Sequence, residues 1–357
     1  MWTSRGYLIE YYTDPQTGIK KRVSVKLSGT SEKAKEKAIK RLTDKIEHMQ
    51  DTKIKLSDCV RLWLKECERS IKPSTFRKYR ITLGSIQDII GDGYMDTITA
   101  GYIRGKFIDC GEENRTLNGY LKTFKTFWRW AYRNDFVQSP EVADKLQSFQ
   151  DTPKRERIQD KYLEPKELTT LIESMKEKRW ALVTEFLALS GLRCGEFASL
   201  NKSDVQGEYI KVYKTYDANN KVVTSAKTYA SKRDVFIQDE LKDCIVRINE
   251  YCKYQAEVCG YTSILFFPDK DGGYLQYYTY RKYLAEVSER VLGRKIVPHT
   301  LRHTHCSVLA SRGMDLSAIS DRLGHSDSKV TKEIYLHKLQ ELKEKENQQL
   351  NSIRFIG

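Results

Sequence analysis

The chain has 357 residues, more than one hydrophobic core usually holds and enough for two or three domains. It carries 62 Lys and Arg against 48 Asp and Glu, for a formal net charge of +14, so its first expected partner is a polyanion such as nucleic acid. No apolar run approaches the ~20 residues of a membrane span, and no apolar stretch follows Met1 as in a secretory signal. The eight cysteines include no Cys-x-x-Cys pair, which argues against a zinc ribbon. We therefore expect a cytoplasmic protein whose cysteines are reduced, buried thiols.

The first 52 residues indicate a small basic unit of two strands and a helix. Residues 7–12 and 19–27 predict an antiparallel pair, and Thr30 or Ser31 is expected to cap a following helix. On the second strand Arg22 and Lys26 alternate with apolar residues, so both are candidates for DNA contacts. A basic sheet backed by a helix has the size to enter a major groove, although a solvated, charged appendage is the alternative.

Residues 53–148 are expected to be wholly helical. Helices are predicted to open at Leu56, at Pro73 and after Thr99, a long helix covers 115–133, and Ser139-Pro140 is expected to end the bundle. The aromatic residues of the long helix recur at helical spacing, which favours a core role over base stacking. Three cations in this block are candidates for phosphate contacts or, equally, for a solvated helix face: Lys72, Arg77 and Lys78.

A polar segment, 149–160, is interpreted as a linker, and a mixed region follows from 161 to 345. Helices are predicted at 164–175, at 181–189 and from Arg193. A hairpin of strands 209–216 and 221–228 and a short strand at 264–267 complete the expected elements, with helices to the end. The fold class predicted for the whole chain is multidomain α+β: a small sheet with a helix, an all-α block, and a mainly α domain with a small antiparallel sheet.

Five of the six histidines lie between 299 and 337. His299 and His303 stand four apart on a helix begun by Pro298, a spacing that two metal ligands can use. However, Thr300 stands where a zinc protease helix carries Glu, and no third ligand has a diagnostic spacing. A cluster of structural histidines is a second alternative.

A third interpretation is cleavage of a DNA strand by a protein nucleophile. Two guanidinium groups, Arg193 and Arg302, would neutralise the non-bridging phosphate oxygens, and Glu196 would orient Arg193 from the same helix face. Lys227, near the end of the hairpin, is placed to protonate the leaving 5′ oxygen. Tyr335, just after the histidine cluster, would supply the attacking hydroxyl.

In this order the motifs resemble those of the tyrosine recombinases, the phage-type integrases. The matching segments are Ser190–Glu196, Lys227, His299–His303, Leu323–His325 and Tyr335–His337. The resemblance implies that Tyr335 forms a 3′-phosphotyrosyl bond, that His299 is a general acid-base residue, and that His325 bonds the phosphate. Lys232 competes with Lys227 for the role of the hairpin lysine. The resemblance also implies that neither ATP, metal nor any other cofactor is needed, because the covalent link conserves the energy of the broken bond.

The resemblance extends to the other regions and to the partners. It implies an arm-type DNA-binding domain at 1–52, a core-binding domain at 53–148, a catalytic domain at 161–345 and a tail at 346–357 that packs onto a neighbouring subunit or is frayed. The expected enzyme is a site-specific recombinase that integrates and excises a mobile element in a bacterial cytoplasm. Its partners would be core-type and arm-type attachment sites and three further copies of itself, with room for an excisionase and a host DNA-bending protein. The rival interpretations are a type IB topoisomerase and a DNA-binding regulator that has lost catalysis.

Overall fold

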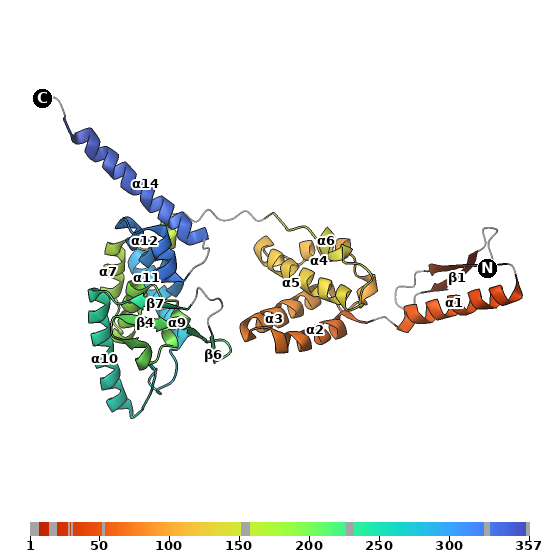
Figure 1. Cartoon of the computed structure of the whole chain (residues 1–357), viewed down its shortest axis with the longest axis horizontal. Helices are drawn as coiled ribbons and strands as arrows, with labels where there is room; N and C mark the ends of the chain where they lie inside the picture. The colour runs from red at the N-terminus through yellow and green to blue at the C-terminus, as the bar shows by residue number, and fades with distance from the viewer. Residues whose placement is uncertain are drawn as a thin grey trace. The chain divides into compact units, whose positions relative to one another are not determined.

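The computed structural model describes residues 7–13, 20–27, 29, 31–51, 54–150, 158–225, 232–324 and 329–354 (Figure 1). The chain divides into two compact units, residues 1–152 and 153–357. Mostly helical structure with small antiparallel sheets confirms the predicted fold class. No helix in the described ranges is long and apolar enough to cross a membrane.

The first unit begins with strands β1 (Tyr7–Thr13) and β2 (Lys20–Lys26), followed by helix α1 (Glu32–Asp51). The strands pair antiparallel, and α1 packs on both of them. Leu8, Val23 and Leu42 form their buried core, while Arg22 and Lys26 lie exposed on β2. Alternation along β2 therefore separates a cationic face from the face that packs on the helix.

The rest of the first unit is helical. Its elements are α2 (Leu56–Ser70), α3 (Pro73–Ile90), the 3₁₀ turn η1 (Met95–Thr97), α4 (Ala100–Asp109), α5 (Asn114–Arg133) and α6 (Glu141–Lys145). The starts follow local chemistry: Pro73 occupies the first turn of α3, and the Thr99 hydroxyl accepts a hydrogen bond from the Tyr102 amide at 3.1 Å. Phe124, Phe127 and Trp128 of α5 are buried together, which confirms their core role.

The helical core extends beyond Ser139-Pro140, where the sequence predicted that it ends. Helix α6 follows directly, and Ala143 and Leu146 are fully buried in the same core. Asn118 then holds Phe149 through two bonds: its Oδ1 accepts from the Phe149 amide at 2.8 Å, and its Nδ2 donates to the Phe149 carbonyl at 3.0 Å. The prediction was wrong because proline tolerates the start of a helix as readily as it ends one.

The second unit surrounds helix α8 with other helices. Its helical elements are η2 (Ile158–Lys161), α7 (Pro165–Glu173), α8 (Lys178–Ser190), α9 (Cys194–Ala198), η3 (Lys202–Asp204), α10 (Asp239–Cys259), α11 (Tyr277–Leu292), α12 (Pro298–Ser311), α13 (Leu316–Leu323) and α14 (Lys329–Ser352). Helices α7, α10, α11 and α12 all pack on α8, whose Phe186 contacts the aromatic rings of Phe197 and Phe266. Figure 1 shows α14 continuing beyond this body as one long helix.

Two small sheets lie beside this helical core. Strands β3 (Val205–Gln206), β4 (Tyr209–Val212) and β7 (Arg233–Phe236) form an antiparallel sheet in the order β3-β4-β7. Strands β5 (Lys214–Asp217) and β6 (Val222–Ser225) form a separate hairpin. The single strand expected at 209–216 is therefore wrong, because Tyr213 separates two strands that belong to different sheets. β4 ends before Tyr213, whose hydroxyl donates to Asp204 at 3.1 Å, and β5 begins after it.

The short strand expected at 264–267 is also wrong. The pairing is limited to an isolated bridge between Leu265 and Asn201, made by backbone hydrogen bonds from the Lys202 amide to the Ile264 carbonyl at 2.9 Å and from the Phe266 amide to the Leu200 carbonyl at 2.8 Å. Phe266 and Phe267 are both buried in the helical core, so the apolar run reflects burial on two sides rather than a place in a sheet. Of the eight cysteines, six are buried, but Cys259 at the end of α10 is exposed, contrary to the expectation of buried thiols throughout.

Candidate active site

A tight turn after α8 carries the first candidate residue. Gly191 ends α8 in the left-handed region, with φ of +66°. A Cβ atom at this position would lie 2.6 Å from Cδ2 of His305 and 2.9 Å from a methyl group of Leu323, so only glycine fits. The turn places Arg193 at the N-terminal cap of the short helix α9.

Glu196 lies between two guanidinium groups. Its Oε1 accepts from Nη1 of Arg193 at 2.7 Å, and its Oε2 accepts from the Arg193 amide at 2.9 Å and from Nη2 of Arg233 at 2.9 Å. The side chains of Glu196 and Arg233 are each only 6% exposed. Burial by itself would raise the pKa of Glu196, but the charges of Arg233 and Arg193 outweigh it and lower the pKa to about 2. The predicted support of Arg193 by Glu196 is thus present as a buried, ionised contact.

Arg302 occupies the buried face of α12. The residue is 1% exposed, and its guanidinium donates to the Gly191 carbonyl at 2.7 Å and to the Leu323 carbonyl. Burial and the nearby charge of Arg193 lower the pKa of Arg302 to about 9, while Glu196 acts in the opposite direction. The group therefore stays charged at neutral pH, and α12 is tied to the turn after α8 and to the end of α13.

His299 precedes Arg302 by one turn of α12. Its ring meets that of His303 edge to face, with 4.7 Å between centroids. Desolvation and the charges of Arg302 and Arg193 lower the pKa of His299, and desolvation with the charge of His299 lowers that of His303 to about 4. His299 is consequently neutral at pH 7 beside two guanidinium groups, a state in which it can accept a proton.

Tyr335 lies on the second turn of α14, which packs on α12. Its ring is partly buried against a cluster that includes Cys306, one turn beyond Arg302, and Leu323, whose carbonyl accepts from Arg302. The nucleophile candidate therefore belongs to a helix that packs on the helix of Arg302 within one protomer.

Two candidates lie outside the described residues, namely Lys227 and His325. Strand β6 ends at Ser225, and Lys232, the alternative hairpin lysine, is exposed. Helix α13 ends at Leu323, and its C-terminal cap Gly324 lies in the left-handed region with φ of +65°, directly before His325.

Arg233 is the site residue that the sequence analysis missed. It lies two residues before the buried Val235 on β7 and alternates with the exposed Asp234 and Phe236, which places it on the inward face of the strand. An arginine on a buried strand face needs a partner of opposite charge, so this alternation was the available signal.

A second missed group supports the site from behind. His305 bonds the Ala188 carbonyl through Nδ1 at 2.8 Å and receives Nε of Arg322 on Nε2 at 3.0 Å. Burial and the charge of Arg322 lower the pKa of His305 to about 3, so the ring is neutral and Nδ1 is the donor. This interpretation assigns His305 a structural role.

The candidates for DNA contacts lie on the first unit. Arg22, Lys26 and Lys78 are exposed, while Arg77 and Lys72 are partly buried on α3 and at its N-terminal cap. Among the described residues no group of three His, Cys, Asp or Glu side chains is arranged to hold a metal ion.

Electrostatically, the site gathers positive charge. The charges of Arg193 and Arg233 lower the pKa of Arg302, and the charge of the Glu196 carboxylate raises it. Three guanidinium groups around one carboxylate leave an environment suited to an anion such as a phosphodiester, with a neutral histidine beside it.

Comparison with known proteins gives a consistent result. The family model for the phage integrase family matches residues 161–341. The chain is 28% identical to the prophage ps2 probable integrase of Lactococcus lactis, over 94% of both chains, and 25% identical to the tyrosine recombinase XerD of Staphylococcus epidermidis, over 76% of this chain and 90% of that one. Its fold is similar to lambda integrase in the crystal structure of a tetramer bound to a Holliday junction, with a TM-score of 0.60, 17% identity, and coverage of 92% of this chain and 96% of that one.

Fold and relatives together define a tyrosine-type site-specific recombinase. The chain belongs to the phage integrase family. Its members recombine DNA at specific sites through a phosphotyrosyl intermediate, and this chain is an integrase of that kind.

Proposed function

We propose that this integrase cleaves and rejoins DNA at paired attachment sites to integrate and excise a mobile element, with Tyr335 as its nucleophile. The observation that carries the proposal is the cluster of Arg193, Arg233 and Arg302 around the buried Glu196, with His299 beside it. A phosphodiester entering this cluster would meet fixed cationic donors, which cost little to reorganise as charge builds on phosphorus.

In the proposed cleavage step the phenolic oxygen of Tyr335 attacks phosphorus while the bond to the 5′ oxygen breaks. Arg193 and Arg302 neutralise the non-bridging oxygens, and the neutral His299 takes the phenolic proton. Lys227 protonates the leaving 5′ oxygen, with Lys232 as the alternative donor, and His325 bonds the phosphate. Rejoining reverses these steps with a 5′ hydroxyl from the partner strand.

The remaining regions are assigned by the same proposal. Residues 1–52 bind arm-type sites through Arg22 and Lys26, and residues 53–148 bind the core site with Lys72, Arg77 and Lys78 at phosphates. The enzyme acts in a bacterial cytoplasm as a homotetramer with two active protomers at a time. An excisionase and a host DNA-bending protein would set its direction.

A plasmid assay tests this proposal against topoisomerase activity. One plasmid carries two attachment sites and a matched plasmid carries none; both are incubated with the full chain in EDTA without ATP. The proposal expects recombinant products from the first plasmid and no relaxation of the second. Relaxation of both plasmids without recombinants would favour the topoisomerase, and binding without cleavage would favour a regulator.

A further inference from the structure

The buried face of α14 contains a lysine where an apolar residue would be expected. Thr331, Ile334 and Lys338 follow one another at helical spacing and are all buried, Lys338 to 4% exposure. Lys338 lies three residues after Tyr335, on the part of α14 that packs against the rest of the second unit. A buried lysine at the end of such a stripe calls for partners.

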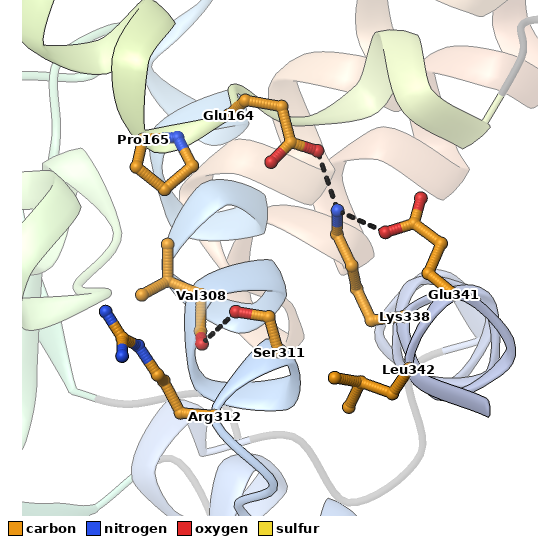
Figure 2. A pocket seen from close by; sticks show the side chains of 8 residues that line it. All are labelled: Glu164, Pro165, Val308, Ser311, Arg312, Lys338, Glu341 and Leu342. Atoms are coloured by element: carbon orange, nitrogen blue, oxygen red, sulfur yellow. Dashed lines mark hydrogen bonds and ion pairs between the residues drawn. The ribbon is translucent and has the colours of Figure 1, made fainter. Parts of the chain in front are cut away.

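Those partners come from the segment through which the chain enters the second unit. The Lys338 ammonium donates to Oε1 of Glu164 at 2.6 Å and lies 4.7 Å from the centre of the Tyr162 ring. It also donates to Oε2 of Glu341 at 2.9 Å, one turn further along its own helix. Figure 2 shows the ammonium between the two carboxylates. Lys338, Glu164 and Glu341 line a cavity of about 440 Å³.

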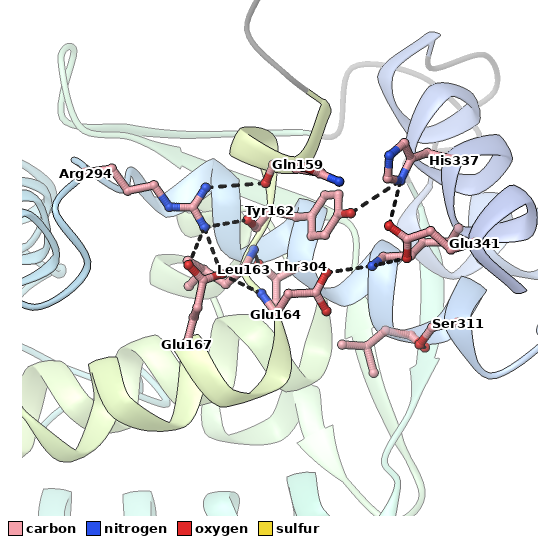
Figure 3. A network of polar contacts seen from close by, with 12 residues as sticks. Gln159, Tyr162, Leu163, Glu164, Glu167, Arg294, Thr304, Ser311, His337 and Glu341 are labelled. Atoms are coloured by element: carbon pink, nitrogen blue, oxygen red, sulfur yellow. Dashed lines mark hydrogen bonds and ion pairs between the residues drawn. The ribbon is translucent and has the colours of Figure 1, made fainter. Parts of the chain in front are cut away.

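Two further links join the same elements on either side of Tyr335. Lys161 contacts Glu333 at 3.3 Å. The Tyr162 hydroxyl lies 3.5 Å from Nδ1 of His337 (Figure 3). These contacts come from the residues two before and two after Tyr335. They are longer than those of Lys338, so the short, charge-assisted bonds of Lys338 define the register.

The entry segment is itself fixed to the helix of Arg302. The Leu163 amide donates to the hydroxyl of Thr304 at 2.9 Å, two residues after Arg302 on α12. Residues 162–164 thus connect the helix of the phosphate-binding arginine with the helix of the nucleophile. A shift of α14 along this segment would move the phenol relative to the guanidinium groups.

We propose that Lys338 is a positioning residue for strand cleavage: its contacts with Glu164, Glu341 and Tyr162 fix α14 on the entry segment and so hold Tyr335 in line with the phosphate site. The inference rests on the proposed assignment of Tyr335 as the nucleophile. A buried ion pair contributes little net stability compared with apolar packing but can specify one register, which is the property that an in-line attack requires.

Lys338→Met in the full chain separates positioning from folding. Methionine retains the length of the stem, and the carboxylates left behind reach water, since the side chain of Glu164 is 53% exposed. We expect single-turnover formation of the covalent adduct on a nicked substrate to slow by about tenfold or more, because an error of ~1 Å in placement is costly. Thermal midpoint and DNA affinity should stay close to those of the wild type. Lys338→Arg should restore most of the cleavage rate.

A second readout bypasses the tyrosine. In a Tyr335→Phe background a DNA strand that ends in a 3′ p-nitrophenyl phosphate is joined when a 5′ hydroxyl forms the new bond to phosphorus and p-nitrophenolate leaves, so the reaction uses the phosphate site and no phenol can attack. In this background Lys338→Met should join the strand at the rate of Tyr335→Phe alone. Lys343→Met, which removes an exposed charge from the same helix, is the matched control and should change the rate of neither reaction.

The outcomes test the positioning role of Lys338 separately from the assignment of Tyr335 as the nucleophile. Wild-type cleavage by Lys338→Met, or equal loss of cleavage and nitrophenyl joining, would overturn the positioning role. Should Lys338→Met not fold, Glu164→Gln keeps the lysine and removes one ionic partner; it should slow cleavage and spare the joining reaction, and unchanged cleavage would count against the inference. Tyr335→Phe should form no adduct yet join the nitrophenyl strand; an adduct from that variant would refute the nucleophile assignment whatever Lys338 does.

Discussion

Glu196 shows how one buried carboxylate organises the charges of the site. It accepts hydrogen bonds from Arg193 on its own helix turn and from Arg233 on β7. These two arginines are 40 residues apart in the sequence. Because both contacts require the ionised form, the pKa of Glu196 falls from 4.5 to about 2. A pKa that is lowered in the folded state stabilises the protein above pH 4.5, and this stabilisation is lost as the pH falls toward 2.

Glu196→Gln should therefore destabilise the protein in a pH-dependent manner. The lowered pKa corresponds to about 3 kcal/mol at pH 7. We expect the difference in unfolding free energy between wild type and variant to shrink by about half or more between pH 6 and pH 3, measured by urea denaturation. A difference that does not vary with pH would show that Glu196 is not held ionised by its neighbours.

The guanidinium groups lead to a prediction on rate. Arg193→Ala should slow single-turnover cleavage by about 10²-fold or more, because it removes a charged donor from the developing phosphorane. Lys253→Ala, which removes an exposed cation from α10, is the control and should cleave at the wild-type rate. Cleavage by Arg193→Ala within threefold of wild type would remove this residue from the proposed mechanism.

Single residues also show what sequence reasoning could reach. The pairing of Arg193 with Glu196 was predictable because residues three positions apart on a helix lie on the same face. Arg233 was not singled out, because its significance depends on β7 lying beside α9, a long-range contact that local spacing does not contain. His305 shares the histidine-rich segment, yet its neighbours rather than its spacing give it a structural role.

At the scale of elements, the turn between α8 and α9 is the most constrained connection of the site. The Gly191 carbonyl receives Arg302, and its missing side chain makes room for His305 and Leu323. Any side chain here would displace the segment that carries Arg193.

Gly191→Ala should consequently reduce both stability and cleavage. Gly207→Ala is a matched control: Gly207 has nearly the same φ of +67°, but no atom lies within 4 Å of its Cβ position. An alanine in the left-handed region costs about 1–2 kcal/mol, and both variants have this cost in common. Only at Gly191 does the added Cβ also collide with neighbouring side chains, so any difference between the two variants reports on that collision. Thermal denaturation should give a lower midpoint for Gly191→Ala than for Gly207→Ala. Equal midpoints would mean that the turn tolerates a side chain.

Helices were easier to predict than strands. Pro73 and Thr99 mark helix starts through local chemistry, and the structure begins helices at Pro73 and directly after Thr99. Strand boundaries depend on partners: the break at Tyr213 follows from two different pairings. Leu265, Phe266 and Phe267 are apolar because they are buried, whereas Ile264 is 73% exposed. The proposed role of α14 in fixing Tyr335 likewise depends on Tyr162 and Glu164, which precede Tyr335 by some 170 residues in the sequence.

At the scale of the whole molecule, the net charge of +14 should dominate affinity for DNA. Binding that neutralises phosphates releases counterions, so a protein with 6–10 phosphate contacts loses roughly 10³–10⁵-fold in affinity between 50 and 200 mM salt. We expect a loss of this order for a duplex with a core site, measured by fluorescence anisotropy. An affinity that hardly varies with salt would argue against extensive phosphate contacts.

The central claim is that Tyr335 attacks the phosphodiester held by the guanidinium cluster. The most direct measurement traps the intermediate: the full chain is incubated with a nicked duplex that carries the core attachment site, the covalent complex is isolated on a denaturing gel, and the DNA-linked peptide is mapped by mass spectrometry. The account predicts a 3′-phosphate bonded to Tyr335 and no adduct with Tyr335→Phe. A DNA-linked peptide centred on another residue, or an adduct that survives in Tyr335→Phe, would contradict it.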